Sequence, residues 1–126
     1  MTPALVFLGA GIGGLARYAI GGWVQGATGA AFPWGTLLVN VTGSLLLTLS
    51  IGVMEQTATS VEWRTFMAIG VWGGYTTFST FSYETVKYLQ DGEWARALAY
   101  VLATVLLTLI AAVAGFRLAS LFIQRG

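Results

Sequence analysis

The most informative stretch of the chain is "GGYTTFSTFS", Gly73–Ser82, which lies inside a long apolar segment. It places five hydroxyl side chains and two phenylalanines behind a pair of glycines. Glycine weakens a helix, and the threonines that follow can bond to backbone carbonyls and bend it. Irregular backbone at membrane depth persists only where protein buries it or a wet cavity borders it. We therefore predict a helix that is broken at Gly73–Gly74.

The composition is that of a membrane protein. Of the 126 residues, 56% are hydrophobic and only 9% are charged, whereas a soluble domain is about 25% charged. A hydrocarbon core about 30 Å thick needs about 20 mostly apolar residues per helix. Four windows meet this requirement, at about residues 3–24, 34–54, 65–83 and 95–123. We predict an all-α fold in which residues 1–126 form a single four-helix transmembrane domain.

Several function classes are excluded by the residue types that the chain lacks. It has no cysteine and no histidine, which removes disulfides, Cys/His zinc sites and a histidine acid–base. Its net charge is only +1 and no basic cluster exists, so the expected partner is the lipid bilayer and not nucleic acid. Serines are abundant, but the candidate base Lys87 lies near the surface. We therefore expect no enzyme and no catalytic residues.

The charges near the helix ends are balanced between the two sides of the membrane. Four spans place both termini and the 55–64 loop on one side (side A), and the 25–33 and 86–94 loops on the other (side B). Cationic residues near the two sides are, for side A, Arg64, Arg117 and Arg125 and, for side B, Arg17, Lys87 and Arg96. Because lysine and arginine near helix ends set orientation, we predict insertion in both orientations and an antiparallel homodimer.

Polar residues from all four predicted helices fall at similar depths near side B. At 1.5 Å per residue, Arg17 and Asn40 each lie roughly 10 Å below that surface. The residues of this half of the membrane are Arg17, Asn40, Phe78, Phe81, Glu84 and Tyr100. Such convergence indicates a vestibule that narrows into a pathway. It favours function over three structural alternatives: a snorkelling Arg17, Asn40 as helix–helix glue, and Tyr100 as an ordinary buried aromatic.

The residues after the glycine pair favour a small anion. Phe78 and Phe81 share one helical face, Ser79 and Ser82 share an adjoining one, and Thr80 lies between them. Hydroxyls donate hydrogen bonds, and ring edges carry the positive end of the aromatic quadrupole. This chemistry indicates a narrow anion pathway without selecting the ion. Around a two-fold axis, the carbonyls freed by two helix breaks would form an oxygen cage for a hard monovalent cation.

Three motifs resemble the Fluc (CrcB) family of fluoride channels. They are "GGLARY" (Gly13–Tyr18), "WGTLLVN" (Trp34–Asn40) and "GGYTTFSTFSYE" (Gly73–Glu84), and the resemblance extends to chain length, four spans and motif order. It implies a multi-pass protein of the bacterial inner membrane. It further implies a dual-topology homodimer with two antiparallel fluoride pores.

The resemblance also implies roles for individual residues. Phe78 and Phe81 match the phenylalanines that line the pores, and Asn40 matches the pore asparagine of the second helix. The remaining matches to pore positions are Arg17, Ser79, Thr80, Ser82, Glu84 at the pore mouth, and Tyr100. Gly73 and Thr76 match the positions whose main-chain carbonyls hold a structural sodium ion, which is not transported.

These implications lead us to expect a passive channel that exports fluoride from the cytoplasm and limits its toxicity. The main alternative is a small multidrug exporter, which is also a dual-topology four-helix dimer. By resemblance, such a pump would need a membrane-embedded carboxylate in its first helix, where this chain has Arg17 and no acid. A purely structural membrane subunit also stays open, although it does not explain the matched depths.

Overall fold

The computed structural model describes residues 1–125, and this part of the chain is helical, with no strand. Its elements, in chain order, are α1 (Thr2–Thr28), α2 (Trp34–Glu55), α3 (Val61–Arg64), the π-helix η1 (Thr65–Trp72), α4 (Gly73–Tyr75), α5 (Phe78–Gln90) and α6 (Trp94–Gln124). The predicted all-α class is confirmed. The third predicted range, 65–83, is shared among several shorter helices that follow one another.

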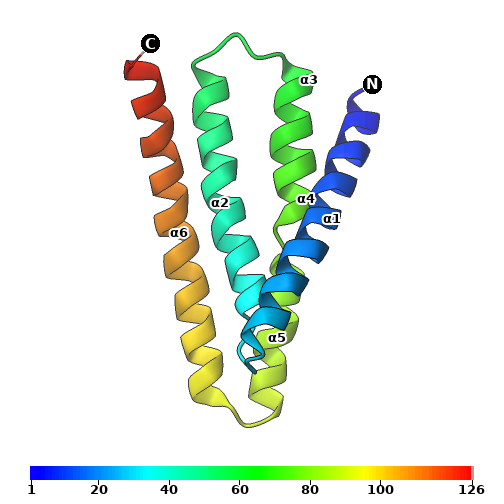
Figure 1. The fold of residues 1–126 in the computed structure, drawn as a ribbon, viewed down its shortest axis with the longest axis vertical. Coiled ribbons are helices and arrows are strands. Elements are labelled where there is room, and N and C mark those ends of the chain that lie inside the picture. Colours follow the sequence, from blue (N-terminus) through cyan, green and yellow to red (C-terminus); the bar gives the residue numbers. More distant parts are fainter. Residues whose placement is uncertain (126) are drawn as a thin grey trace.

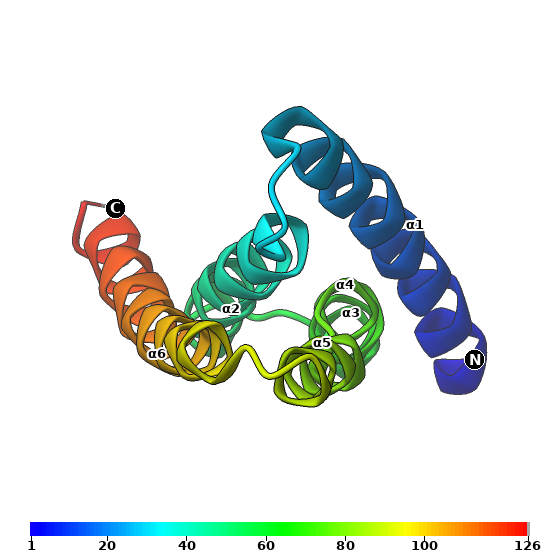
Figure 2. The same ribbon diagram turned by 90° about the horizontal axis from the view of Figure 1, so that it is seen from below.

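The long helices run side by side in an open arrangement (Figures 1 and 2). The start of α1, the α2–α3 connection and the end of α6 lie at one end, and the α1–α2 and α5–α6 connections lie at the other. In the end-on view α2 lies between α6 and the line of α3, α4 and α5, while α1 crosses at an angle. Within residues 1–125, three helices are long and apolar enough to cross a membrane, namely α1, α2 and α6. The protein is a multi-pass membrane protein.

The helical backbone is interrupted at Thr76 and Thr77, so the predicted position at Gly73–Gly74 was wrong. Gly73 has ordinary helical angles, with φ −63° and ψ −39°, and Gly74 lies inside α4. Thr76 (φ −86°, ψ 156°) and Thr77 (φ −147°, ψ 116°) are extended instead. Gly74 serves close packing, because a Cβ there would lie 2.6 Å from the carbonyl oxygen of Ala10.

Close backbone contact also joins α1 to η1. At Gly13, which is buried, an added Cβ would lie 2.8 Å from the backbone nitrogen of Tyr75 and would also collide with the Val71 carbonyl oxygen. Only glycine lets the two backbones approach this closely. Gly13, together with Gly9, therefore lets α1 pack against the segment that leads to the interruption.

We predict that Gly13→Ala costs about 1–3 kcal/mol or more of unfolding free energy, because the extra methyl group must push backbone apart. Gly11→Ala is the matched control: it lies two residues away on the same helix, and its Cβ would meet no atom of residues 1–125 within 4 Å beyond its own stretch of helix. Alanine is the better helix former, so the control should be neutral or stabilising by about 0.5–1 kcal/mol. Unfolding of both variants in mixed micelles measures the difference, and equal stabilities would contradict the packing.

Candidate functional site

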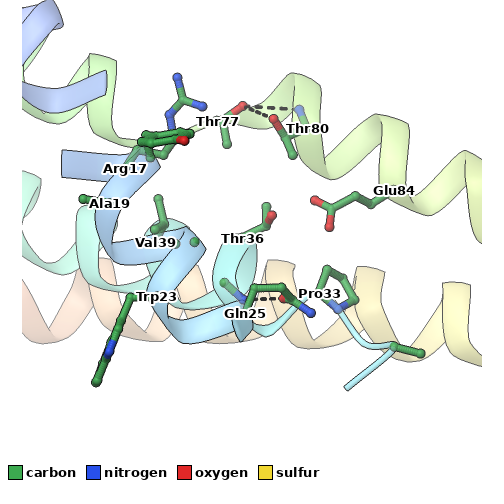
Figure 3. Close-up of a pocket in the computed structure, with 15 residues that line it drawn as sticks. Arg17, Ala19, Trp23, Gln25, Pro33, Thr36, Val39, Thr77, Thr80 and Glu84 are labelled. Carbon is green, nitrogen blue, oxygen red and sulfur yellow. Dashed lines mark hydrogen bonds between the residues drawn. The ribbon is translucent and has the colours of Figure 1, made fainter. Parts of the chain in front are cut away.

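A large hollow opens between α1, α2 and α5, with a volume of about 740 Å³. We call it the vestibule (Figure 3). Its charged lining residues are Arg17 and Glu84, and its hydroxyl-bearing lining residues include Thr36, Thr77 and Thr80. Glu84 projects into it from α5, opposite the α2 wall that carries Thr36. Two of the predicted site residues from different helices, Arg17 and Glu84, thus meet in one polar space.

Arg17 forms a hydrogen bond to the backbone next to the interruption. Its side chain is half-buried, and Nε donates a hydrogen bond to the Gly74 carbonyl over 3.2 Å. An unpaired arginine at membrane depth costs about 2.5–3.5 kcal/mol on insertion scales, so this bond and the polar vestibule both stabilise it. The guanidinium thereby places positive charge at the inner end of the vestibule, beside the backbone of α4.

A second, smaller hollow of about 260 Å³ lies beside α2, α5 and α6. We call it the groove. The residues that line it are Asn40, Ser44, Thr76, Thr77, Phe78, Phe81, Thr104, Val105 and Thr108. Thr77 lines the vestibule as well. Seven of the predicted site residues are therefore divided between two hollows that share Thr77, and four line neither hollow: Gly73, Ser79, Ser82 and Tyr100.

The two phenylalanines of the groove have very different surroundings. Their ring centroids are 5.5 Å apart, yet the Phe81 side chain is 8% exposed and Phe78 is 77% exposed. Phe81 packs on Tyr100 with centroids 5.1 Å apart. Phe78 presents a large apolar ring on the open side of the groove, where a single chain gives it little to contact.

Asn40 holds the interruption from α2. Its Oδ1 accepts a hydrogen bond from the Thr77 backbone nitrogen over 2.8 Å, and its Nδ2 donates to the Thr77 carbonyl over 3.0 Å. Asn40 is buried, with 8% of its surface exposed. A buried amide that satisfies both backbone groups of an extended residue stabilises the break in the helix.

Most of the hydroxyls that follow the glycine pair form hydrogen bonds within their own segment, residues 77–82. Thr77 Oγ1 accepts from the Thr80 backbone nitrogen at 3.2 Å and so caps α5. Ser82 Oγ donates to the Phe78 carbonyl over 3.0 Å. Ser79 is exposed, and its Oγ lies 3.3 Å from Thr77 Oγ1. The structure thus gathers these hydroxyls near Thr77, but Ser82 uses its donor within α5.

Tyr100 of α6 contacts one residue of each hollow, Glu84 and Phe81. Its side chain is fully buried and lines neither hollow in the described residues. Its hydroxyl donates to Glu84 Oε1 over 3.4 Å, while its ring supports Phe81. The carboxylate of the vestibule and a ring of the groove are therefore held by one side chain from α6.

Sequence reasoning missed two groove residues of α6, Thr104 and Thr108. The Thr104 hydroxyl is buried, and no residue among 1–125 pairs with it, which is unusual because buried polar groups are normally satisfied. A sequence signal existed: Tyr100, Thr104 and Thr108 recur every fourth residue in an otherwise apolar helix, which places them on one face. Thr36 of the vestibule was missed as well.

Among the backbone carbonyls at the interruption, those of Gly73 and Thr76 lose their usual helical donors to side chains. In a continuous helix, Gly73 O would accept from Thr77 N, and Thr76 O would accept from Thr80 N. Here Thr77 N bonds to Asn40, and Thr80 N bonds to the Thr77 hydroxyl. Carbonyl oxygens released in this way are suitable ligands for a hard cation. In the described residues no group of three or more acidic, histidine or cysteine side chains offers an alternative metal site.

Comparisons with known proteins show the family of this chain. The family described as CrcB-like protein, Camphor Resistance (CrcB), matches residues 4–116. A Thermus thermophilus protein named fluoride-specific ion channel FluC is 50% identical over 114 residues, which cover 90% of each chain. A Rhizobium meliloti protein of the same name is 45% identical over 90% of this chain and 92% of its own. A third, from Pelobacter propionicus, is 44% identical over 100% of this chain and 96% of its own. The chain belongs to the CrcB-like family of membrane proteins.

Proposed function

We propose that the protein is a fluoride-specific ion channel. The relatives that match nearly its whole length carry that name. The observation that carries the proposal is the groove, where the exposed ring of Phe78 lies beside the unpaired hydroxyl of Thr104. Ring edges and hydroxyl donors attract an anion without binding it as tightly as a buried lysine would, and conduction requires such weak binding.

The channel is proposed to be an antiparallel homodimer with two pores. Phe78 is 77% exposed, and large apolar side chains cover much of the outer surface of α1 and α6. A second copy in the opposite orientation would close each groove into a pore. The continuous segment of α3, η1 and α4 would then be one half of a broken spanning helix and α5 the other half. The vestibule would lead from side B toward the pore. Asn40, Phe78, Phe81, Ser79, Thr80, Ser82, Tyr100, Glu84 and Arg17 are the pore and vestibule residues of this proposal.

Passive conduction suffices for export of fluoride from the cytoplasm. Hydrogen fluoride enters cells as a neutral weak acid and ionises at the higher internal pH, which traps the anion. An electrically driven leak of the anion relieves this accumulation without coupling to an energy source.

The test is fluoride efflux from liposomes that contain the purified protein, with chloride as the comparison ion. We expect rapid fluoride efflux and little chloride efflux. Absence of fluoride flux, or equal chloride flux, would overturn the proposal. Proton-coupled extrusion of a cationic dye from the same liposomes would favour a multidrug exporter instead.

We further propose that the carbonyls of Gly73 and Thr76 hold a structural sodium ion at the centre of the dimer. The support is that both carbonyls have lost their helical donors to other groups. Two such carbonyls from each subunit would give a hard monovalent cation an all-oxygen site. The ion would bind both subunits and hold them together, without being transported.

Replacing sodium with a large organic cation should therefore weaken the dimer without changing which anion permeates. An ion present at about 100 times its dissociation constant stabilises by about 2.7 kcal/mol, and that contribution should disappear. Melting of the purified dimer at graded sodium concentrations measures it, with potassium as a size control. A melting temperature independent of sodium after extended exchange would contradict an exchangeable site.

A further inference from the structure

Three side chains determine which backbone carbonyls remain available at the interruption. Asn40 Oδ1 takes the amide that would otherwise bond to Gly73 O. The Thr77 hydroxyl takes the amide that would otherwise bond to Thr76 O. Arg17 Nε donates to Gly74 O, which removes that carbonyl from competition. The carbonyls of Gly73 and Thr76 are therefore two that have lost their helical donors to side chains.

Asn40 comes first in this series of hydrogen bonds that replace helical ones. Its amide bonds to both the N–H and the C=O of Thr77 and so holds Thr77 in its extended conformation. That conformation places the Thr77 hydroxyl where it caps α5 and occupies Thr80 N. Without Asn40, Thr77 N could return to Gly73 O as in a continuous helix. One N–H of the Asn40 amide remains for the groove, because the group has two.

We propose that Asn40 is the positioning residue of the cation site: by clasping the backbone of Thr77 it releases the Gly73 and Thr76 carbonyls toward the ion. It contacts no ion itself and acts through Thr77. The inference rests on the sodium ion of the proposed function. It adds a role for Asn40 that is separate from any contact with the permeating anion.

The decisive variant is Asn40→Leu, which keeps the approximate size but removes both the Oδ1 acceptor for Thr77 N and the NH2 donor to the Thr77 carbonyl. Thr77 N is then free to return to Gly73 O, and the sodium concentration for half-maximal thermal stabilisation of the dimer should rise about ten-fold or more. Hydrogen exchange at the amides of Thr77 and Thr80 should accelerate about ten-fold or more, because Thr77 loses its fixed partner and with it the extended conformation that caps α5.

Ser50→Ala is the matched control. It removes another side-chain hydrogen bond between α2 and the third segment, in which Trp72 Nε1 donates to Ser50 Oγ over 2.9 Å. It touches neither Thr77 nor the two carbonyls. Ser50→Ala should lower the melting temperature at every sodium concentration, while the half-maximal sodium concentration and the exchange of Thr77 stay as in the wild type.

The outcomes are distinguishable. A raised sodium requirement together with faster Thr77 exchange in Asn40→Leu, and neither in Ser50→Ala, supports the inference. A wild-type sodium requirement in Asn40→Leu overturns it, as does an equal shift in Ser50→Ala. If the wild-type protein conducts fluoride but ignores sodium, the ion itself is refuted and the inference fails with it, while the fluoride channel stands.

Discussion

Phe78→Leu is expected to lower fluoride flux about ten-fold or more while the protein still folds and dimerises. Leucine fills space but has no positive ring edge to meet an anion. Phe78 is 77% exposed in the protomer, so little of the protomer's own packing depends on it. A purely structural account of this ring therefore predicts almost no effect on flux.

Phe81 provides the contrast that separates conduction from packing. It is 8% exposed and packs on Tyr100, so Phe81→Ala should cost about 3–5 kcal/mol of unfolding free energy. Its flux would then be difficult to interpret, whereas Phe78→Leu isolates the ring edge. Phe78→Met should recover part of the flux, because the methyl hydrogens beside its polarizable sulfur are slightly positive.

The measurement is fluoride efflux per dimer from liposomes, after size analysis has confirmed the dimer for each variant. Leu102→Ala is a control for apolar truncation, since Leu102 is an exposed α6 residue outside both hollows. Wild-type flux in dimeric Phe78→Leu would mean that the ring only packs, and the anion path would then have to run elsewhere.

The sequence predicted the fold class and the neighbourhood of the site, because both follow from patterns along single helices. Apolar windows define spans, and depth follows from counting residues. Counting placed Arg17 and Glu84 in the same half of the membrane, and both line the vestibule. The position of the interruption depends on contacts between helices instead. Gly74 packs against α1, and Asn40 of α2 fixes Thr77. Neither contact is visible in the local sequence.

The burial of individual side chains could not be predicted from the sequence either. Phe78 and Phe81 lie on one helical face in the sequence pattern, but only Phe81 packs on the ring of Tyr100. The sequence contains a sign of Thr104, because polar residues recur every fourth position along an apolar helix. This spacing shows that they share a face of the helix but not what that face contacts. The unpaired hydroxyl of Thr104 became evident only when the neighbouring helices were in place.

The second large effect concerns orientation in the membrane. Side A has exposed positions in and beside its loop where lysine disturbs no packing, namely Glu55, Gln56 and Ala58. Lysine at all three should bias side A toward the cytoplasm, because lysines near helix ends set orientation. The native Arg64 lies there already, but it is half-buried and donates from Nη2 to the Met54 carbonyl over 2.6 Å.

If each pore requires two copies in opposite orientations, the biased protein should lose nearly all fluoride efflux, because antiparallel partners become scarce. Efflux should return when a second copy with lysines at exposed side B positions, Gly26, Ala27 and Gln90, is co-expressed. Each biased copy alone serves as the control for the other, since lysines that merely damaged folding would not be rescued by a partner that also carries lysines. Full efflux from either biased copy by itself would reject the antiparallel requirement, and the groove would then have to be closed by a parallel partner or by lipid.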